Sequence, residues 1–265
     1  MSLATSARSV SQSLPGGEWL FRPLPIDNPR TRLICFPYAG GNASLFRAWP
    51  RYFPGVEIVG IQTPGRGARF REPPLRRIGD LVECVVDAII PLLNVSCDYA
   101  LYGHSLGALC AFEMARSLRR RGAKAPLGLF VSGREAPHIP DKRPHIHRVS
   151  KGAFFSTLTQ RYPGGTPREI LDDPELMELL EPSIRADFEI LETRVHRDES
   201  PLAIPIFVFG GRADRDIAPS ELGAWAAQTS SRCEVAVLDG DHFFIQSNES
   251  EFLTQLARAL TSVER

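Results

Sequence analysis

The sequence has neither a surplus of charge nor a long apolar run. Its 265 residues include 31 Lys plus Arg and 31 Asp plus Glu, which gives a formal net charge of zero. A nucleic-acid-binding protein draws much of its affinity from positive charge placed on phosphates, so this balance argues against nucleic acid as a partner. No segment approaches the roughly 18 apolar residues of a membrane helix, and the N-terminus lacks the apolar core of a signal peptide. We therefore expect a cytoplasmic protein with no membrane partner.

Cysteine is scarce and irregularly spaced. The five cysteines are Cys35, Cys84, Cys97, Cys110 and Cys233. An odd number of cysteines in mostly apolar segments favours reduced, buried thiols over a disulfide framework. Closely spaced pairs of the kind that hold zinc do not occur. The sequence therefore predicts a fold stabilised by its apolar core rather than by cross-links or a structural metal.

Short apolar runs alternate with longer amphipathic stretches along the chain. The expected strands lie at 32–36, 56–61, 99–103, 127–133, 204–211 and 233–240. The expected helices lie at about 43–50, 78–93, 105–121, 219–229 and 249–263. Several of the strands are largely apolar without alternation, which is typical of a parallel sheet covered on both faces. The alternation predicts an α/β fold with a doubly wound, mostly parallel sheet.

Two segments fall outside this alternation. Residues 1–17 contain five serines and end in Pro15-Gly16-Gly17, a composition that predicts a disordered tail ahead of a single domain over 18–265. Residues from about 135 to 200, called the lid below, contain helical patterns and no convincing strand. An insertion of this size in an α/β domain favours a helical lid over the sheet edge. The alternative is a set of extra helices without a gating role.

The motif G-x-S-x-G occurs once, as Gly103-His104-Ser105-Leu106-Gly107. An expected strand precedes it and an expected helix follows it, which is the setting of a nucleophile elbow. In such an elbow the serine adopts a strained backbone conformation that only small neighbours permit. The alternative is an ordinary helix whose N-cap happens to be Ser105.

A serine nucleophile needs a base and a carboxylate that orients the base. His242 follows the expected strand 233–240 directly, at the sheet edge where catalytic groups of α/β proteins collect. The other five histidines read as structural or surface residues: His104, His138, His145, His147 and His196. Asp214 and Asp216 both follow the strand 204–211 in the chain order Ser, acid, His. We favour Asp214, because it is closer to the strand end and Asp216 could instead cap the next helix.

An oxyanion hole would complete this set of groups. One donor should be the backbone N–H of Leu106, the residue after the serine. The second should come from the loop after the first core strand, where Gly40 and Gly41 allow close backbone approach. Ala39 is the expected donor in that loop, with Tyr38 as the second choice.

The residues around these positions resemble the type II (external, editing) thioesterases that accompany polyketide synthases and nonribosomal peptide synthetases. The likeness runs in order through "FPYAGGNASLFRAW", "YGHSLGALCAFEMARSL", "FGGRAD" and "GDHFF". It includes "DDPELMELLEPSIRADFEILET" in the lid, which generic α/β hydrolases do not share. The resemblance covers most of the chain, from about residue 32 to 245, and implies the α/β-hydrolase fold.

The resemblance also implies an activity, namely hydrolysis of acyl groups from the phosphopantetheine thiol of acyl or peptidyl carrier proteins. Ser105, Asp214 and His242 match the family's nucleophile, acid and base. No cofactor or metal is expected in the protein itself, because the substrate carries the phosphopantetheine. We expect a monomer whose partners are carrier proteins.

Several alternatives remain open from the sequence. The same triad would serve a product-releasing thioesterase, a carboxylesterase or an acyltransferase. A protein of another class, a non-catalytic module that binds carrier proteins, is a further alternative. A releasing thioesterase is usually fused to a synthase, so a single domain favours the editing role. The loop from 66 to 77 departs from the family and contains Arg66, Arg69, Arg71, Arg76 and Arg77. This basic loop would either meet a carrier protein or be plain solvated surface. Phe154, Phe155 and Met177 would either line an acyl pocket or belong to the core.

Overall fold

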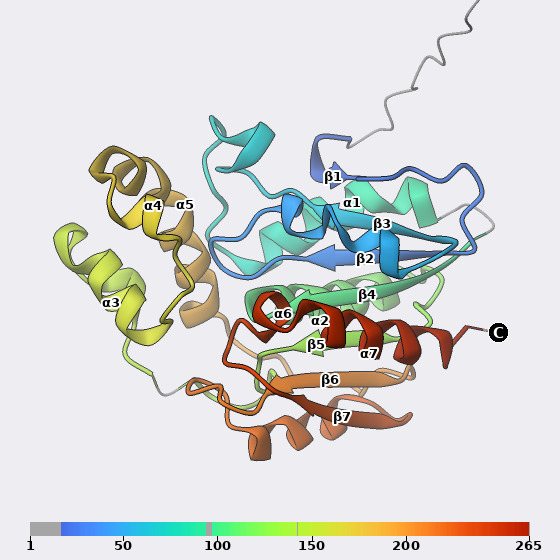
Figure 1. Ribbon diagram of the computed structural model, residues 1–265. Coiled ribbons are helices and arrows are strands. Elements are labelled where there is room, and N and C mark those ends of the chain that lie inside the picture. The colour runs from blue at the N-terminus through green and yellow to red at the C-terminus, as the bar shows by residue number, and fades with distance from the viewer. Residues whose placement is uncertain (1–16, 94–96, 142, 265) are drawn as a thin grey trace, which may run out of the picture.

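A seven-stranded sheet forms the centre of the molecule (Figure 1). The computed structural model describes residues 17–93, 97–141 and 143–264. The strands are β1 (Leu20–Phe21), β2 (Thr31–Phe36), β3 (Val56–Ile61), β4 (Asp98–His104), β5 (Leu129–Ser132), β6 (Ile206–Gly211) and β7 (Cys233–Leu238). Their order in the sheet is β1-β3-β2-β4-β5-β6-β7, and β1 alone runs antiparallel to its neighbour. All strand carboxyl ends from β2 to β7 therefore meet at one edge.

Helices cover both faces of the sheet, as the largely apolar strands predict. Helices α1 (Ile78–Leu93) and α2 (Leu106–Arg120) pack on one face, in a cluster with Ile34 and Phe36 of β2. Helix α7 (Glu249–Thr261) packs on the other face, in a second cluster with Leu33 and Cys35. Alternate residues of β2 thus point to opposite faces of the sheet and pack in two separate core clusters. Each such side chain contributes about 1.5–3 kcal/mol when it leaves water.

Every expected strand overlaps an observed one, but three local details differ from the expectation. The stretch 43–50 forms two 3-10 helices, η2 (Ala43–Phe46) and η3 (Trp49–Tyr52), because Pro50 lacks the N–H that a continuing helix needs. The stretch 219–229 is also a 3-10 helix, η7 (Pro219–Gln228). Strand β1 was not expected, because two residues are too few to form a pattern. The predicted N-terminal tail lies, except for Gly17, outside the described residues.

The lid consists of helices inserted between β5 and β6. These are η5 (Ile146–Arg148), η6 (Lys151–Ala153), α3 (Phe154–Arg161), α4 (Arg168–Leu171) and α5 (Pro174–Thr193). Helices α3, α4 and α5 lie beyond the carboxyl ends of the parallel strands (Figure 1). Asp173 caps α5 by accepting the N–H groups of Glu175 and Leu176, and Pro174 occupies the first helical position. No helix in the described residues is both long and apolar enough to span a membrane.

The remaining helical segments are short. They are η1 (Gly17–Trp19), η4 (Gly67–Arg69) and α6 (Phe244–Ser247). Helix α6 follows the loop that carries His242, and its residues Phe244 and Ile245 are buried against α7 in the second core. The loop after β7 is therefore held at both ends, by the strand and by α6.

Candidate active site

Ser105 occupies a strained turn between β4 and α2. Its backbone has φ 53° and ψ −113°, and it is the one non-glycine residue with positive φ in the described part of the chain. Such a conformation costs about 1–3 kcal/mol and persists only where the surroundings impose it. The N–H of Ser105 donates to the carbonyl oxygen of Ser132 at 2.8 Å, which ties the turn to the neighbouring strand β5.

The two glycines of the motif are required by close backbone contacts. A Cβ atom on Gly103 would lie 2.0 Å from the carbonyl oxygen of Gly107. A Cβ atom on Gly107 would lie 2.2 Å from the carbonyl oxygen of Phe36. Real Cβ atoms essentially never approach within 3.0 Å. The spacing G-x-S-x-G therefore sets the first turn of α2 directly against the end of β2, next to the loop that contains Ala39.

His242 and Asp214 form a buried pair on the loops after β7 and β6. The Nδ1 atom of His242 lies 2.9 Å from Oδ2 of Asp214, whose side chain is fully buried. The other carboxylate oxygen, Oδ1, accepts the backbone N–H groups of Asp216 at 2.8 Å and Ile217 at 3.1 Å. Because a carboxylate only accepts, Nδ1 of His242 carries the proton and Nε2 is left as an acceptor. The pair therefore holds the imidazole in the tautomer that a general base needs.

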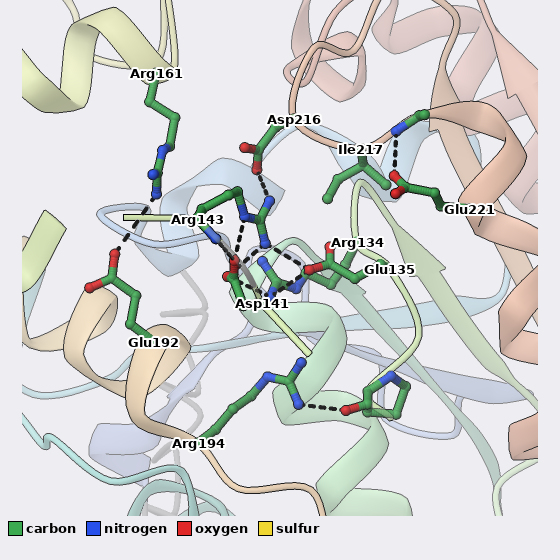
Figure 2. Close-up of polar contacts among 12 residues, drawn as sticks. Arg134, Glu135, Asp141, Arg143, Arg161, Glu192, Arg194, Asp216, Ile217 and Glu221 are labelled. Atoms are coloured by element: carbon green, nitrogen blue, oxygen red, sulfur yellow. Dashed lines mark hydrogen bonds and ion pairs between the residues drawn. The ribbon is translucent and has the colours of Figure 1, made fainter. Parts of the chain in front are cut away.

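Asp216 belongs to a different group of charges. Its carboxylate accepts from Arg143 and from the hydroxyl of Tyr162. Figure 2 shows Arg143 between Asp216 on one side and Glu135 and Asp141 on the other. Asp216 does not cap the next helix, because the N-cap of η7 is Ala218, whose N–H donates to the side chain of Glu221 within η7. Asp216 thus ties the acid loop to the base of the lid, and among the described residues no hydrogen bond or ion pair joins it to His242.

A cavity of about 330 Å³ lies between the sheet edge and the lid. Ser105, His242 and Ala39 line its sheet side. The lid side presents mainly apolar side chains, namely Leu158, Ile170, Leu180, Ile184 and Phe188. The serine, the histidine and the expected oxyanion loop therefore open into one pocket with an apolar far wall.

Three lid residues considered for this pocket lie elsewhere. Phe154 and Phe155 are buried in the first core cluster, and Met177 packs against that cluster. None of the three lines the cavity. They belong to the core, while residues one to three helical turns further along α3 and α5 face the pocket.

Aromatic rings surround the imidazole of His242. The ring centroids of Tyr162 and His104 each lie 5.1 Å from that of His242. His104 is fully buried, and its Nδ1 lies 2.8 Å from the hydroxyl of Ser132. Burial, reinforced by the neighbouring His242, holds the pKa of His104 well below its ordinary value. His104 is therefore a neutral, structural residue, and it adds no positive charge beside His242.

The loop after β2 forms a tight turn over Tyr38–Gly41. The N–H of Gly41 donates to the carbonyl oxygen of Tyr38 at 2.9 Å, and Gly40 has φ 81°, the two signatures of a type II turn. The N–H of Gly40 is already used, because it donates to Oδ2 of Asp187 at 2.7 Å. The N–H of Ala39 has no acceptor in the described part of the chain. Of the N–H groups at Ala39, Gly40 and Gly41, that of Ala39 is thus the one left free.

Leu106 contributes a second free donor. As the first residue of α2, it has no carbonyl one turn earlier in the helix to receive its N–H. No acceptor for this N–H occurs among the described residues. Both backbone donors expected for an oxyanion hole are therefore unpaired.

The arginine-rich loop from 66 to 77 is less basic than the sequence indicates. Arg66 is buried and forms a bidentate pair with Asp187, with nitrogen–oxygen distances of 2.7 and 2.8 Å. Arg69 is also buried, pairs with Glu72 and lies 3.9 Å from the centroid of the Trp19 ring. The expectation of a uniformly solvated or docking loop is therefore wrong for its first two arginines, because acidic partners neutralise them.

The histidines at the base of the lid are half-buried rather than solvated. His147 donates from Nδ1 to Glu192 at 2.5 Å, and Glu192 also accepts the backbone N–H groups of Ile146 and His147. His145, His147 and Glu192 are the one group in the described residues whose spacing could hold a metal ion. None of them lines the cavity. The expectation that the site works without metal or cofactor stays a prediction.

Known proteins share both the sequence and the fold. The profile of the thioesterase domain family matches residues 31–262. The gramicidin S biosynthesis protein GrsT of Aneurinibacillus migulanus is 39% identical over 235 residues, covering 88% of this chain and 90% of that protein. RedJ, a thioesterase of the prodiginine pathway in Streptomyces coelicolor, is 36% identical, with a TM-score of 0.80 over 87% of this chain and 90% of RedJ.

A second solved structure gives the same result. YbtT, the type II thioesterase of the yersiniabactin pathway, is 31% identical and superposes with a TM-score of 0.81 over 93% of this chain and 100% of YbtT. With the strained serine turn, the parallel sheet and the helical insertion already described, these matches leave one assignment. The chain belongs to the thioesterase domain family and has the α/β-hydrolase fold of its members.

Proposed function

We propose that this protein is an editing thioesterase, which removes acyl groups from the phosphopantetheine arm of acyl or peptidyl carrier proteins. The observation that carries the proposal is that Ser105, in its strained turn, and the His242–Asp214 pair line one pocket. Two relatives support the assembly-line role, since GrsT is a gramicidin S biosynthesis protein and YbtT is a type II thioesterase of an NRPS/PKS pathway.

Acylation of the serine is the first half of the proposed reaction. Nε2 of His242 takes the proton from Oγ of Ser105 as that oxygen attacks the thioester carbonyl carbon. Asp214 stabilises the imidazolium through its hydrogen bond to Nδ1. The tetrahedral oxyanion accepts the N–H groups of Leu106 and Ala39, and the positive end of the α2 dipole favours the same charge. The carbon–sulfur bond then breaks, and the proton on His242 passes to the leaving thiolate.

Hydrolysis of the acyl-enzyme is the second half. A water molecule attacks the ester carbonyl while Nε2 of His242 removes its proton. The same two backbone donors hold the second oxyanion. The bond between the acyl carbon and Oγ of Ser105 breaks, Oγ regains the proton from His242, and the free acid leaves. The two half-reactions therefore use one base and one oxyanion hole in turn.

The pocket supports an apolar acyl group as the part of the substrate that is buried. A volume of about 330 Å³ is at the small end of ligand pockets, and its far wall is built from aliphatic and aromatic lid residues. In this arrangement the acyl chain faces the lid helices while the thioester carbonyl lies at the sheet edge. We expect the protein to act as a monomer in the cytoplasm.

The test is a comparison of substrates that share one acyl group. Acyl-loaded carrier protein, the matching N-acetylcysteamine thioester and a matching oxygen ester are incubated with the protein, and the free acid is measured. We expect the highest kcat/KM for the carrier-bound thioester. Equal kcat/KM for the oxygen ester would instead indicate a carboxylesterase, and transfer of the acyl group to an added alcohol or amine in place of water would indicate an acyltransferase.

A further inference from the structure

A buried ion pair joins the lid to the rest of the molecule beside the catalytic pocket. Arg66, in the loop after β3, binds both carboxylate oxygens of Asp187, in the C-terminal half of α5. Each of the two side chains is about 7% exposed. Arg66 also donates to the carbonyl oxygen of Ser183, one turn earlier in α5, at 3.4 Å. The proposed chemistry uses neither charge directly, so the pair calls for another explanation.

Both partners of this pair also bind the turn that carries the proposed oxyanion donor. Asp187 accepts the N–H of Gly40 at 2.7 Å, and Arg66 donates to the carbonyl oxygen of Gly41 at 2.9 Å. Ile184 packs on the same turn, because a Cβ atom on Gly40 would lie 3.4 Å from its Cγ1. The turn is therefore held on both sides of Gly40 and capped by a side chain from α5.

We propose that Arg66 and Asp187 are positioning residues for the oxyanion hole, and that α5 is consequently part of the hydrolytic site rather than a freely opening part of the lid. The inference rests on the proposed function, since it requires that Ser105 attacks a thioester whose oxyanion is held by Ala39. It adds two charged residues and helix α5 to the groups that position the oxyanion hole for that reaction.

The physical reason lies in the turn itself. A type II turn converts to type I when its central peptide, between Ala39 and Gly40, rotates by about half a turn. Glycine at Gly40 imposes little barrier against this rotation, because it tolerates both signs of φ. In the rotated turn the carbonyl oxygen of Ala39 would point where the Gly40 N–H points now, towards the carboxylate of Asp187. Repulsion between these oxygens disfavours the rotated form, so Asp187 holds the turn in one conformation. The Ala39 N–H belongs to the preceding peptide group and does not rotate with the central one. Its position is fixed because the turn that carries it is anchored at Gly40 and Gly41.

Arg66 is needed because the carboxylate is buried. A carboxylate buried at this depth without a charged partner is strongly disfavoured, and water drawn in to solvate it would compete with the Gly40 N–H for its oxygens. The bidentate guanidinium supplies that partner and fixes the direction of both oxygens of Asp187. Arg66 and Asp187 therefore act on the turn as one unit, although they are 121 positions apart in the sequence.

The test separates positioning from folding by using two variants. Asp187→Asn keeps the side-chain shape but removes the charge. The double variant Arg66→Met with Asp187→Leu replaces the buried pair with apolar groups, which proteins often tolerate without loss of stability. Both are assayed with an acyl N-acetylcysteamine thioester and with a trifluoromethyl ketone analogue, which forms a hemiketal oxyanion with the nucleophilic serine.

We expect kcat to fall by about 10–100-fold in both variants while KM stays within about twofold, because the ground-state carbonyl is held less strongly than the oxyanion. The inhibition constant of the trifluoromethyl ketone should rise by the same factor as kcat/KM falls. The double variant should approach the wild-type Tm without recovering kcat. A structural role alone predicts the opposite for the double variant, which would then regain kcat together with Tm.

A second ion pair between the same loop and the same helix supplies the matched control. Arg76 pairs with Glu189 on α5 at 2.5 Å, but both side chains are partly exposed and neither touches the turn. Glu189→Gln should leave kcat and the inhibition constant unchanged. Wild-type kcat in the double variant, or an equal loss in Glu189→Gln, would overturn the inference. A wild-type protein that fails to hydrolyse the thioester would contradict the proposed function instead.

Discussion

Replacing Asp214 by asparagine tests the proposed triad at its most specific contact. Oδ1 of Asp214 accepts two backbone N–H groups, and Oδ2 accepts Nδ1–H of His242 at 2.9 Å. In Asp214→Asn the amide oxygen must stay on the two N–H groups, because an amide NH₂ there would meet donors. The NH₂ group then faces Nδ1 of His242 and forces that nitrogen to become the acceptor.

The expected loss of activity follows from the tautomer. With Nδ1 as an acceptor, Nε2 carries the proton and no longer accepts one from Ser105. We expect kcat to fall by about 10⁴-fold, equivalent to about 5.4 kcal/mol of transition-state stabilisation. The assay follows thiol release from an acyl N-acetylcysteamine thioester with a thiol reagent, between about pH 6 and pH 9.

Asp216→Asn is the matched control, two residues further along the same loop. It removes a charge that faces Arg143 and Tyr162 and leaves the imidazole contact intact. We expect kcat to change by less than about tenfold. An equal or larger loss in Asp216→Asn would refute the assignment of Asp214 as the acid. So would a rate for Asp214→Asn close to that of wild type.

Three further predictions concern stability. Gly107→Ala should lower the free energy of unfolding by about 3 kcal/mol, because the added Cβ would lie 2.2 Å from the carbonyl oxygen of Phe36 at the end of β2. A loss below about 1 kcal/mol, measured by urea unfolding, would contradict this close contact. Tyr162→Phe removes a hydrogen bond to the carboxylate of Asp216 and should cost about 2 kcal/mol, with kcat within about threefold of wild type because the ring stays in place; an unchanged unfolding curve would disagree. Burial alone would raise the pKa of Glu199, but three α2 arginines outweigh it and lower this pKa to about 2. A lowered carboxylate pKa stabilises the fold above the unfolded value of 4.5 and loses its contribution as the pH falls from there towards 2. Urea unfolding at about pH 6 and about pH 3.5 should therefore show wild type and Glu199→Gln converging at the lower pH, and a constant difference would contradict the ion pair.

The parts of the fold that the sequence predicted are those determined by local pattern. Largely apolar runs without alternation mark parallel strands whatever their neighbours are, and all six expected strands overlap observed ones. The serine turn was equally visible, because its G-x-S-x-G motif lies within one strand, one turn and one helix, although the contact that requires Gly107 is with Phe36 of β2. His242 and Asp214 could be placed together because carboxyl ends of parallel strands share one edge.

The parts that the sequence left open depend on side chains far apart in the chain. Five arginines in twelve residues indicate a basic surface, and nothing local reveals that Asp187 neutralises Arg66. Which lid residues face the pocket was left open for a related reason. Phe154 and Phe155 are the most apolar pair of α3, and Leu158 lies one turn further along the same face of the helix. Only Leu158 lines the cavity, because its position along the helix, which sequence pattern does not reveal, brings it there.

The central claim is that Ser105 forms an acyl-enzyme with a group taken from a carrier protein. The most direct measurement is intact-protein mass spectrometry after rapid mixing with acyl-loaded carrier protein, followed by peptide mapping of the adduct. In the wild type we expect a transient mass increase equal to the acyl group, located on Ser105. In Ser105→Ala we expect neither this mass increase nor release of the free acid. Free-acid release that persists in Ser105→Ala, or an adduct on another residue, would contradict this claim.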